Sequence, residues 1–128
     1  MERLYADYKD KAEFYVVYIK EAHPSDGWTV SRNEQAGISV ADPKTYAGRV
    51  EVAHSACTLL RISLPCLVDS MDDRVNKAYA AWPDRLYVVD AAGKIAVKGG
   101  TGPGGFAPSV KEAAAWLEKT FGARGAPP

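Results

Sequence analysis

The stretch that decides the fold runs from Phe14 to Trp28 and has two contrasting halves. The first half is Phe14-Tyr15-Val16-Val17-Tyr18-Ile19-Lys20, in which six aromatic or β-branched residues follow one another. Such a run predicts a strand buried on both faces, as in a parallel sheet. The second half, Glu21-Ala22-His23-Pro24-Ser25-Asp26-Gly27-Trp28, is mostly polar. Pro24 removes a backbone donor and Gly27 permits a left-handed turn, so we expect a loop at the carboxyl end of the strand.

The polar loop carries the side chains that could perform chemistry. Ligands of open α/β sheets bind at the carboxyl ends of the strands, where this loop would present Glu21, His23, Ser25 and Asp26. An imidazole changes its charge near neutral pH and can pass a proton to a reacting group. The simpler interpretation is a loop histidine that is only hydrogen-bonded, and one His in a turn does not separate the two.

The octet Glu21–Trp28, preceded by Val-Val-Tyr-Ile, resembles the signature of the iodothyronine deiodinases, a branch of the thioredoxin fold related to peroxiredoxins. The resemblance extends from about Leu4 to Phe121, because further pieces follow in that family's order. These pieces are Met71-Asp72-Asp73, Ala78-Tyr79, Pro83-Asp84-Arg85-Leu86-Tyr87-Val88-Val89, Gly93-Lys94-Ile95, Gly99-Gly100-Thr101-Gly102-Pro103 and Trp116-Leu117-Glu118.

The resemblance implies one α/β, thioredoxin-like domain over residues 1–121, with a mixed sheet, flanking helices and a flexible tail at 122–128. In that fold a central strand precedes the first helix, whose N-terminus stabilises a nucleophilic thiolate or selenolate. Here the first expected helix begins at Met1, so we expect this strand and a Cys or selenocysteine nucleophile upstream of Met1. Selenocysteine is encoded by UGA, normally a stop codon, and a misassigned start at Met1 would follow. A natural fragment or an engineered truncation is the alternative.

The resemblance also implies roles for individual residues. His23 would donate a proton or keep the nucleophile ionised, and Glu21 or Asp26 would orient its imidazole. Trp82 and Pro83, joined by a cis peptide bond in that fold, would line the substrate groove. The other expected substrate contacts are Ser25, Asp26, Trp28 and Thr101.

Two departures from the family pattern bear on the substrate. Thr101 stands where the family often carries Arg, and residues 36–45 lack the second His of hormone-converting members. Both departures remove contacts to thyroid hormone. We therefore expect reductive deiodination of iodinated phenolic compounds, with a thiol reductant as cosubstrate and no bound cofactor or metal. A thiol-dependent peroxidase or disulfide reductase is one alternative function, and a catalytically inert binding domain is another. Without the upstream nucleophile, this chain should be inactive.

The two cysteines, Cys57 and Cys66, are too few for a disulfide framework. Cys57 falls on the apolar stripe of an expected helix and Cys66 falls in an expected strand, where Cys behaves as a small hydrophobe. Neither residue lies in a Cys-x-x-Cys motif or at a helix N-terminus. We therefore expect both thiols in core-like positions, with a redox role the less favoured interpretation.

The remaining elements follow from periodicity, caps and turn residues. Asp42-Pro43 should open a helix to about Arg61 with one buried stripe, and Ser70 or Asp72 should cap a short helix to about Ala81. Ser109-Val110-Lys111-Glu112 reads as a capping box for the last helix, whose buried stripe would be Val110, Ala114, Leu117 and Phe121. The other expected elements are a helix at 1–11, strands at 66–69, 85–90 and 95–98, a hairpin turn at 91–94 and a Gly-rich loop at 99–107.

The composition limits the classes of partner that the chain can bind. The chain has 128 residues, with 16 acidic and 16 basic side chains, so no overall field draws it to nucleic acid or an anionic membrane. No apolar run approaches the roughly 18 residues of a membrane span, and the polar start does not resemble a signal peptide. We therefore expect a cytoplasmic location and a small-molecule substrate.

The sheet order that the resemblance implies is 66–69, 14–20, the missing strand, 85–90 and 95–98. Without its middle strand the sheet exposes two long apolar edges, and such edges pair with another strand. We therefore expect either direct pairing of 14–20 with 85–90 or a homodimer that fills the gap.

Overall fold

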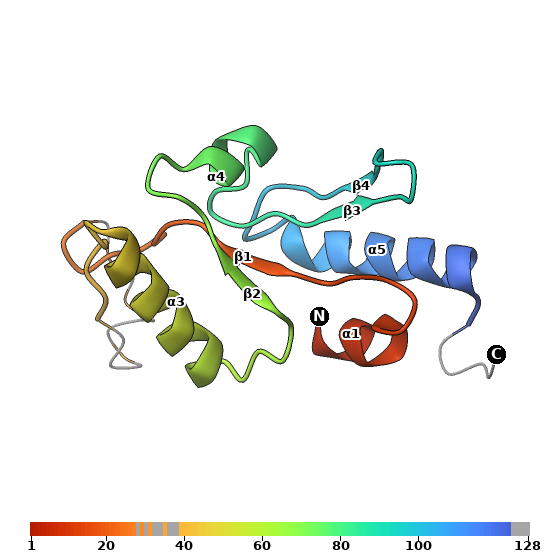
Figure 1. Ribbon diagram of the computed structural model, residues 1–128, viewed down its shortest axis with the longest axis horizontal. Coiled ribbons are helices and arrows are strands. Elements are labelled where there is room, and N and C mark those ends of the chain that lie inside the picture. Colours follow the sequence, from red (N-terminus) through yellow and green to blue (C-terminus); the bar gives the residue numbers. More distant parts are fainter. Residues whose placement is uncertain (28, 30, 32–34, 36–38, 124–128) are drawn as a thin grey trace. The chain divides into compact units, whose positions relative to one another are not determined.

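The computed structural model describes residues 1–27, 29, 31, 35 and 39–123 (Figure 1). The chain divides into two compact units, one formed by Met1–Tyr15 with the chain from Ala81 onward and the other by Val16–Ala80. Each unit holds its own two-stranded sheet. Most of the expected tail, residues 124–128, lies outside the described residues, and a single domain over 1–121 stays a prediction.

The unit Val16–Ala80 is built on a parallel strand pair (Figure 1). β1 (Val16–Tyr18) pairs with β2 (Cys66–Val68) in a register that sets Val16 opposite Cys66 and Tyr18 opposite Val68. Helix α3 (Tyr46–Leu59) packs against β2. The expected parallel pairing of 14–20 with 66–69 is confirmed.

The expectation that the first strand is buried on both faces is wrong. Val17 and its register partner Leu67 are 36% and 48% exposed, whereas Val16 and Tyr18 are half-buried. Since side chains alternate along a strand, Val17 and Leu67 share one uncovered face of this pair. The apolar run alone did not reveal how many partners would cover it.

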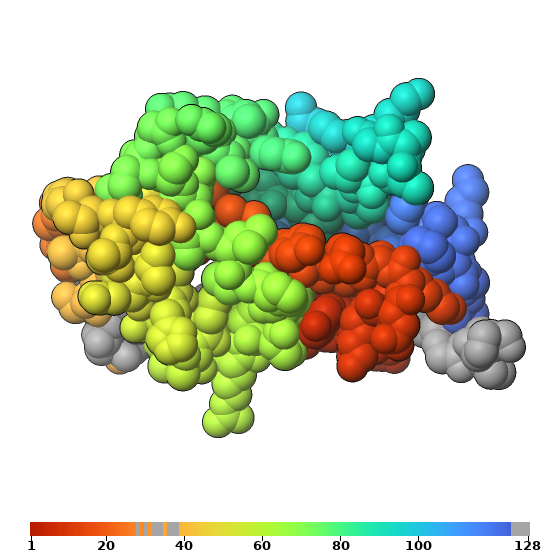
Figure 2. All heavy atoms as spheres, viewed as in Figure 1, coloured from red at the N-terminus to blue at the C-terminus, as the bar shows by residue number. Residues whose placement is uncertain are grey.

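Helix α3 also begins later than Asp42-Pro43 predicts. Its N-cap is Thr45, whose hydroxyl accepts the amide of Gly48 at 3.1 Å, and the helix starts at Tyr46. Ala53, a member of the expected apolar stripe, is buried, but the other buried residue of α3 is Arg49. The side chains of α3, yellow in Figure 2, form part of the molecular surface there, and Tyr46, Val50, Leu59 and Leu60 are exposed.

The unit formed by Met1–Tyr15 and the chain from Ala81 onward contains a β-hairpin. β3 (Tyr87–Val89) pairs antiparallel with β4 (Ile95–Lys98), as expected for 85–90 and 95–98. The carboxylate of Asp90 accepts the amides of Ala92 and Lys94 at 2.9 Å each, and Gly93 adopts a φ of 77° that suits glycine. These local contacts fix the predicted turn.

The core of the same unit joins its two helices. Leu4 and Tyr8 from α1 (Glu2–Tyr8) cluster with Leu117 from α5 (Phe106–Phe121), and Figure 1 shows α1 beside α5. The Tyr8 hydroxyl donates to the Gly122 carbonyl at 3.2 Å, which joins the start of the chain to the end of α5. Helix α5 also packs on β4.

The predicted capping box at Ser109 is wrong, because α5 begins at Phe106. Ser109 lies inside the helix, where its buried hydroxyl donates to the Gly105 carbonyl at 2.5 Å and accepts the Gly100 amide at 3.0 Å. Pro108 falls in the first turn, where a helix tolerates proline, so the helix can start before it. The buried residues are Ser109, Ala113 and Leu117; of the expected stripe only Leu117 is fully buried.

The α/β class is confirmed, with small parallel and antiparallel sheets. In the described part of the chain β1 and β3 belong to separate two-stranded sheets, so the direct pairing of 14–20 with 85–90 is not formed there. The missing central strand and the homodimer stay predictions.

Candidate functional site

The loop that follows β1 is held by backbone hydrogen bonds. The Ser25 amide donates to the Val40 carbonyl at 2.8 Å, and the Gly27 amide donates to the Pro24 carbonyl at 3.0 Å. A side chain at Gly27 would meet the Pro24 ring at 3.0 Å, so the turn favours glycine. The loop is therefore a hydrogen-bonded turn that is joined to the segment near Val40. Its predicted member Trp28 lies outside the described residues.

His23 lies in this loop, five residues beyond the last residue of β1. Its side chain is half-buried and so keeps partial access to solvent. Whether His23 faces Pro83 stays a prediction, because the two residues belong to different units.

Glu21 is positioned by a residue that sequence reasoning missed. The Tyr18 hydroxyl donates to Glu21 Oε2 at 2.8 Å, which ties the carboxylate back to the end of β1. Burial, and then the Glu21 carboxylate, raise the pKa of Tyr18 well above its ordinary value. Tyr18 therefore remains a protonated donor. The available signal for this contact in the sequence was the spacing of three residues between Tyr18 and Glu21, across the end of the strand.

Asp26 has a different role in the same loop. Its Oδ1 accepts the Asp42 amide at 2.9 Å, and its Oδ2 lies 3.6 Å from Lys44 Nζ. The Asp42 amide, together with Lys44, holds the pKa of this exposed carboxyl below its usual value. Through these contacts Asp26 links the loop to the segment that leads to α3.

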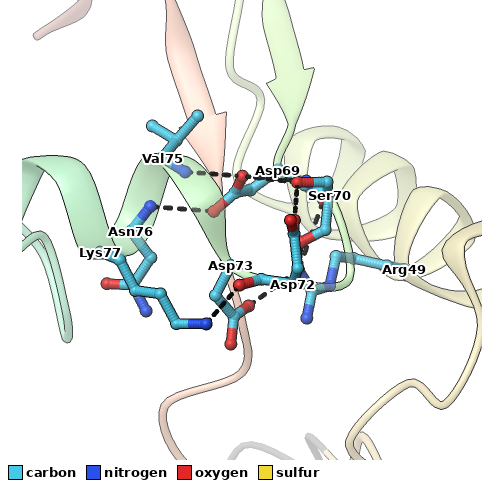
Figure 3. A network of polar contacts seen from close by, with 8 residues as sticks. All are labelled: Arg49, Asp69, Ser70, Asp72, Asp73, Val75, Asn76 and Lys77. Atoms are coloured by element: carbon cyan, nitrogen blue, oxygen red, sulfur yellow. Dashed lines mark hydrogen bonds and ion pairs between the residues drawn. The ribbon is translucent and has the colours of Figure 1, made fainter.

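A buried polar network fixes the carboxyl end of β2 (Figure 3). Asp69 directly follows the strand, and its carboxylate accepts the amides of Ser70, Val75 and Asn76 at 2.9 Å each. Two of these amides belong to α4 (Arg74–Tyr79), so Asp69 stabilises the start of that helix. The caps expected at Ser70 or Asp72 are wrong. The N-cap position is Asp73, which makes no side-chain cap bond.

Arg49 completes this network from α3. Its guanidinium donates to the carbonyls of Asp69 and Ser70 at 3.3 and 2.7 Å and pairs with Asp73 at 3.0 Å (Figure 3). Arg49 and Asp69 are both buried. Burial alone would raise the pKa of Asp69, but the three amides and Arg49 outweigh it and hold the pKa below its ordinary value.

The network lies at the sheet end from which the His23 loop departs. The Asp69 amide donates to the Tyr18 carbonyl at 2.8 Å, joining the ends of β1 and β2. Asp69 thus holds the backbone of Tyr18, and the Tyr18 hydroxyl in turn holds Glu21. Sequence reasoning missed Arg49 and Asp69, and an acid directly after an apolar strand was the available signal for Asp69.

The predicted groove residues lie in the other unit. The Trp82–Pro83 bond is cis, as expected, and Trp82 is exposed while Pro83 is half-buried. The Arg85 guanidinium donates to the hydroxyl of exposed Thr101, and the neighbouring Gly102 amide donates to the Asp84 carbonyl at 2.9 Å. The structure thus places a guanidinium, which sequence reasoning missed, beside Thr101.

A Cβ at Gly102 would collide with the Asp84 carboxylate, so a larger residue there would require the Asp84 side chain to move. The Gly102–Pro103 bond is also cis, which the sequence did not predict. Strand-side residues 84–85 and loop residues 101–103 therefore meet closely within this unit.

The cysteines lie away from the His23 loop. Cys66 is exposed at the amino end of β2, opposite Val16, whereas the loop follows Tyr18 at the carboxyl end of the pair. The expectation of a core-like Cys66 is wrong, because the short sheet leaves this position uncovered. Cys57 on α3 is half-buried. His54, which precedes it on the same helix, is exposed.

Metal ligands and membrane spans are both missing from the part of the chain that the structure describes. Within the described residues, no group of three or more His, Cys, Asp or Glu side chains could hold a metal ion. None of the helices formed by these residues is long and apolar enough to cross a membrane.

The sequence matches known proteins over almost its whole length. The family model "Iodothyronine deiodinase" matches residues 1–121. The chain is 39% identical over 126 residues to type II iodothyronine deiodinase of Rattus norvegicus, covering 95% of this chain and 46% of the relative. It is 38% identical over 120 residues to thyroxine 5-deiodinase of Gallus gallus, covering 91% of this chain and 43% of the relative.

The human type II iodothyronine deiodinase is 37% identical over 126 residues, covering 95% of this chain and 44% of the relative. The chain thus spans somewhat less than half the length of the curated relatives it matches. That family is thioredoxin-like, which agrees with the mixed α/β architecture. From the match over residues 1–121, the chain belongs to the iodothyronine deiodinase family.

Proposed function

We propose that this chain supplies the acid–base and substrate-contacting residues of a deiodinase-like oxidoreductase that acts on iodinated phenolic compounds. Two thiols would reduce one carbon–iodine bond, so that Ar–I and 2 RSH yield Ar–H, RSSR, H⁺ and I⁻. The family match over residues 1–121 is the observation that carries this proposal. The relatives' names supply the reaction class, which is deiodination, and they name iodothyronine and thyroxine.

In this proposal His23 is the acid–base group. It donates the proton that replaces iodine on the ring or keeps the nucleophile ionised. Glu21 is the better candidate to orient the imidazole, because Tyr18 holds it at the strand end, whereas the contacts of Asp26 close the loop onto Asp42 and Lys44. Tyr18 is then a positioning residue that acts through Glu21.

We propose a nucleophilic Cys or selenocysteine outside residues 1–128, because Cys66 is unsuited to the role. Cys66 lies at the amino end of the strand pair, opposite Val16. Val16 is two residues, each rising about 3.3 Å, before Tyr18, after which the His23 loop begins. Burial and a hydrogen bond with Cys57 raise the pKa of Cys66 to about 11, so its thiol is protonated at neutral pH.

The substrate contacts we propose are Ser25, Asp26 and Trp28 from the loop and Trp82, Pro83 and Thr101 from the other unit. Arg85 adds a guanidinium beside Thr101. Such a donor suits a phenolate or carboxylate, which compensates in part for the Arg that the family often has at the position of Thr101. A thiol reductant, a homodimer and a cytoplasmic location complete the proposal.

The test compares this chain with a version extended upstream by a segment with Cys or selenocysteine at the nucleophile position. Both proteins are assayed with dithiothreitol on an iodinated phenol, by iodide release, and on hydrogen peroxide. We expect iodide release from the extended protein and little or none from the short chain. Turnover of peroxide alone would favour the peroxidase. An extended protein that is inert on both substrates would favour the binding domain.

Turnover by the short chain that disappears in Cys66→Ser would show that the nucleophile is Cys66. Turnover that disappears in Cys57→Ser instead would place the nucleophile at Cys57, which lies on the helix.

A further inference from the structure

The two cysteines lie together, away from the end of the sheet that carries the His23 loop. Cys57 belongs to α3 and Cys66 is the first residue of β2, and α3 packs against β2. The Cys66 thiol interacts with that of Cys57, and it donates to the Leu67 carbonyl at 3.8 Å. They are the only cysteines of the sequence.

The backbone between them is fixed at both ends. The Ile62 amide donates to the carbonyl of Cys57 itself at 2.9 Å, in a turn where Arg61 has a left-handed φ of 51°. On the other side the Val16 amide donates to the Pro65 carbonyl at 2.9 Å, which fixes the start of β2 next to β1. The turn thus returns the chain from α3 to β2, and these two elements pack against each other.

Access to the pair is asymmetric. Cys66 is exposed and Cys57 is half-buried. A small disulfide in solution can therefore reach Cys66 first, while Cys57, on the helix that packs against β2, can attack the mixed disulfide that results. This arrangement of an accessible and a resolving thiol is typical of reversible dithiol sites.

We propose that Cys57 and Cys66 form a redox-active dithiol that closes to an intrachain disulfide between α3 and β2, with a low-molecular-weight disulfide as oxidant. The Cys66 thiolate attacks one sulfur of RSSR and releases the first RSH. The Cys57 thiolate then attacks Cys66 Sγ and releases the second. The protein loses two hydrogen atoms and the oxidant gains them, so the exchange balances as two thiols and RSSR giving one disulfide and 2 RSH.

This site is independent of the proposed deiodinase chemistry. Cys66 pairs with Val16 at the amino end of the sheet, whereas the His23 loop follows its carboxyl end. The raised pKa of Cys66 makes its attack slow at neutral pH, so the dithiol should respond to sustained oxidation rather than turn over rapidly.

The test treats the folded 128-residue chain with oxidised glutathione, quenches with N-ethylmaleimide and digests with trypsin. Cleavage at arginine leaves Cys57 in Val50–Arg61 and Cys66 in Ile62–Arg74, so an intrachain disulfide joins two separate peptides. We expect this linked pair in a monomeric protein that lacks two hydrogen atoms and takes up no N-ethylmaleimide. Dithiothreitol should restore both alkylation sites.

Two cysteine variants distinguish a reacting pair of thiols from a single exposed thiol. Cys57→Ser should keep glutathione on Cys66 as a stable mixed disulfide, because no thiol remains to displace it, whereas the native chain should release it. Cys66→Ser should react with glutathione several-fold more slowly, because Cys57 is less accessible. A native chain that carries glutathione on both cysteines, or that links Cys66 only between two molecules, would overturn the proposal.

Discussion

At the residue scale, a few buried polar contacts decide how the end of the β1–β2 pair is built. Asp69 satisfies three backbone amides with one carboxylate, and Arg49 holds the carbonyls around it. Tyr18 binds Glu21 at the end of the neighbouring strand. The role that we propose for His23 requires supports of this kind, because small displacements at a reacting centre cost large factors in rate.

Replacing Asp69 with Asn should destabilise the fold. An Asn side chain offers one acceptor oxygen where the carboxylate accepts three amides with two, so buried amides lose their partner. We expect a loss of about 2 kcal/mol or more in the free energy of unfolding, measured by urea denaturation. Asp72→Asn is the matched control, because Asp72 is exposed, and it should change the free energy by less than about 0.5 kcal/mol. Equal effects of the two variants would contradict this account.

The same carboxylate should make stability depend on pH. The pKa of Asp69 is lower in the folded chain than its ordinary value, so the folded state favours the ionised form. This contribution is present above the ordinary pKa of about 4 and is lost as the pH falls through the folded value. The Asp69→Asn variant should therefore lose less stability than the native chain between neutral pH and about pH 3. Parallel acid titrations by circular dichroism would reveal the difference.

At the scale of elements, local patterns predicted the strands and the hairpin, while helix ends depended on contacts that the sequence does not display. The turn at 91–94 was predictable because Asp90 and Gly93 act within a few residues of each other. The cap of α4 was not, because it comes from Asp69, five residues before the helix. The predicted stripe of α3 is correct at Ala53 but missed the buried Arg49, which binds backbone oxygens from a distant segment.

The N-cap of α3 offers a test at this scale. Thr45→Ala removes the hydroxyl that accepts the Gly48 amide, and we expect a loss of about 1 kcal/mol in the free energy of unfolding. Ser55→Ala on the exposed side of the same helix is the control. Its hydroxyl only donates to the Glu51 carbonyl within the helix, so the free energy of unfolding should change by no more than about 0.5 kcal/mol. A larger loss in Ser55→Ala than in Thr45→Ala would show that the cap is misassigned.

At the scale of the whole molecule, the family relationship and the site octet were recognisable from the sequence, whereas burial was not. The octet Glu21–Trp28 on its own indicated the deiodinase family, and the family model that matches residues 1–121 agrees with it. The exposure of Val17 and Leu67 was not predictable, because an apolar run does not state how many strands or helices will cover it. For the same reason the sequence misjudged Cys66 as core-like.

The exposed strand face supports the homodimer that we predict. Among the described residues β1 and β3 each have one strand partner, and Val17 and Leu67 leave apolar surface uncovered. We expect light scattering to give twice the mass of the chain. Val17→Lys should shift the protein toward monomer, while Leu59→Lys, on the exposed side of α3, should not. A monomeric native chain at all concentrations would contradict the prediction.

The central claim is that His23 performs acid–base chemistry in deiodination, and the chain supplies its own control, because it contains only one other histidine, His54. The decisive measurement is iodide release from an iodinated phenol by the upstream-extended protein with dithiothreitol, compared among the native sequence, His23→Ala and His54→Ala. We predict that His23→Ala lowers the rate by about 10²-fold or more, as for other positioned acid–base groups, and that exposed His54→Ala retains it. Equal rates for all three proteins would contradict the account.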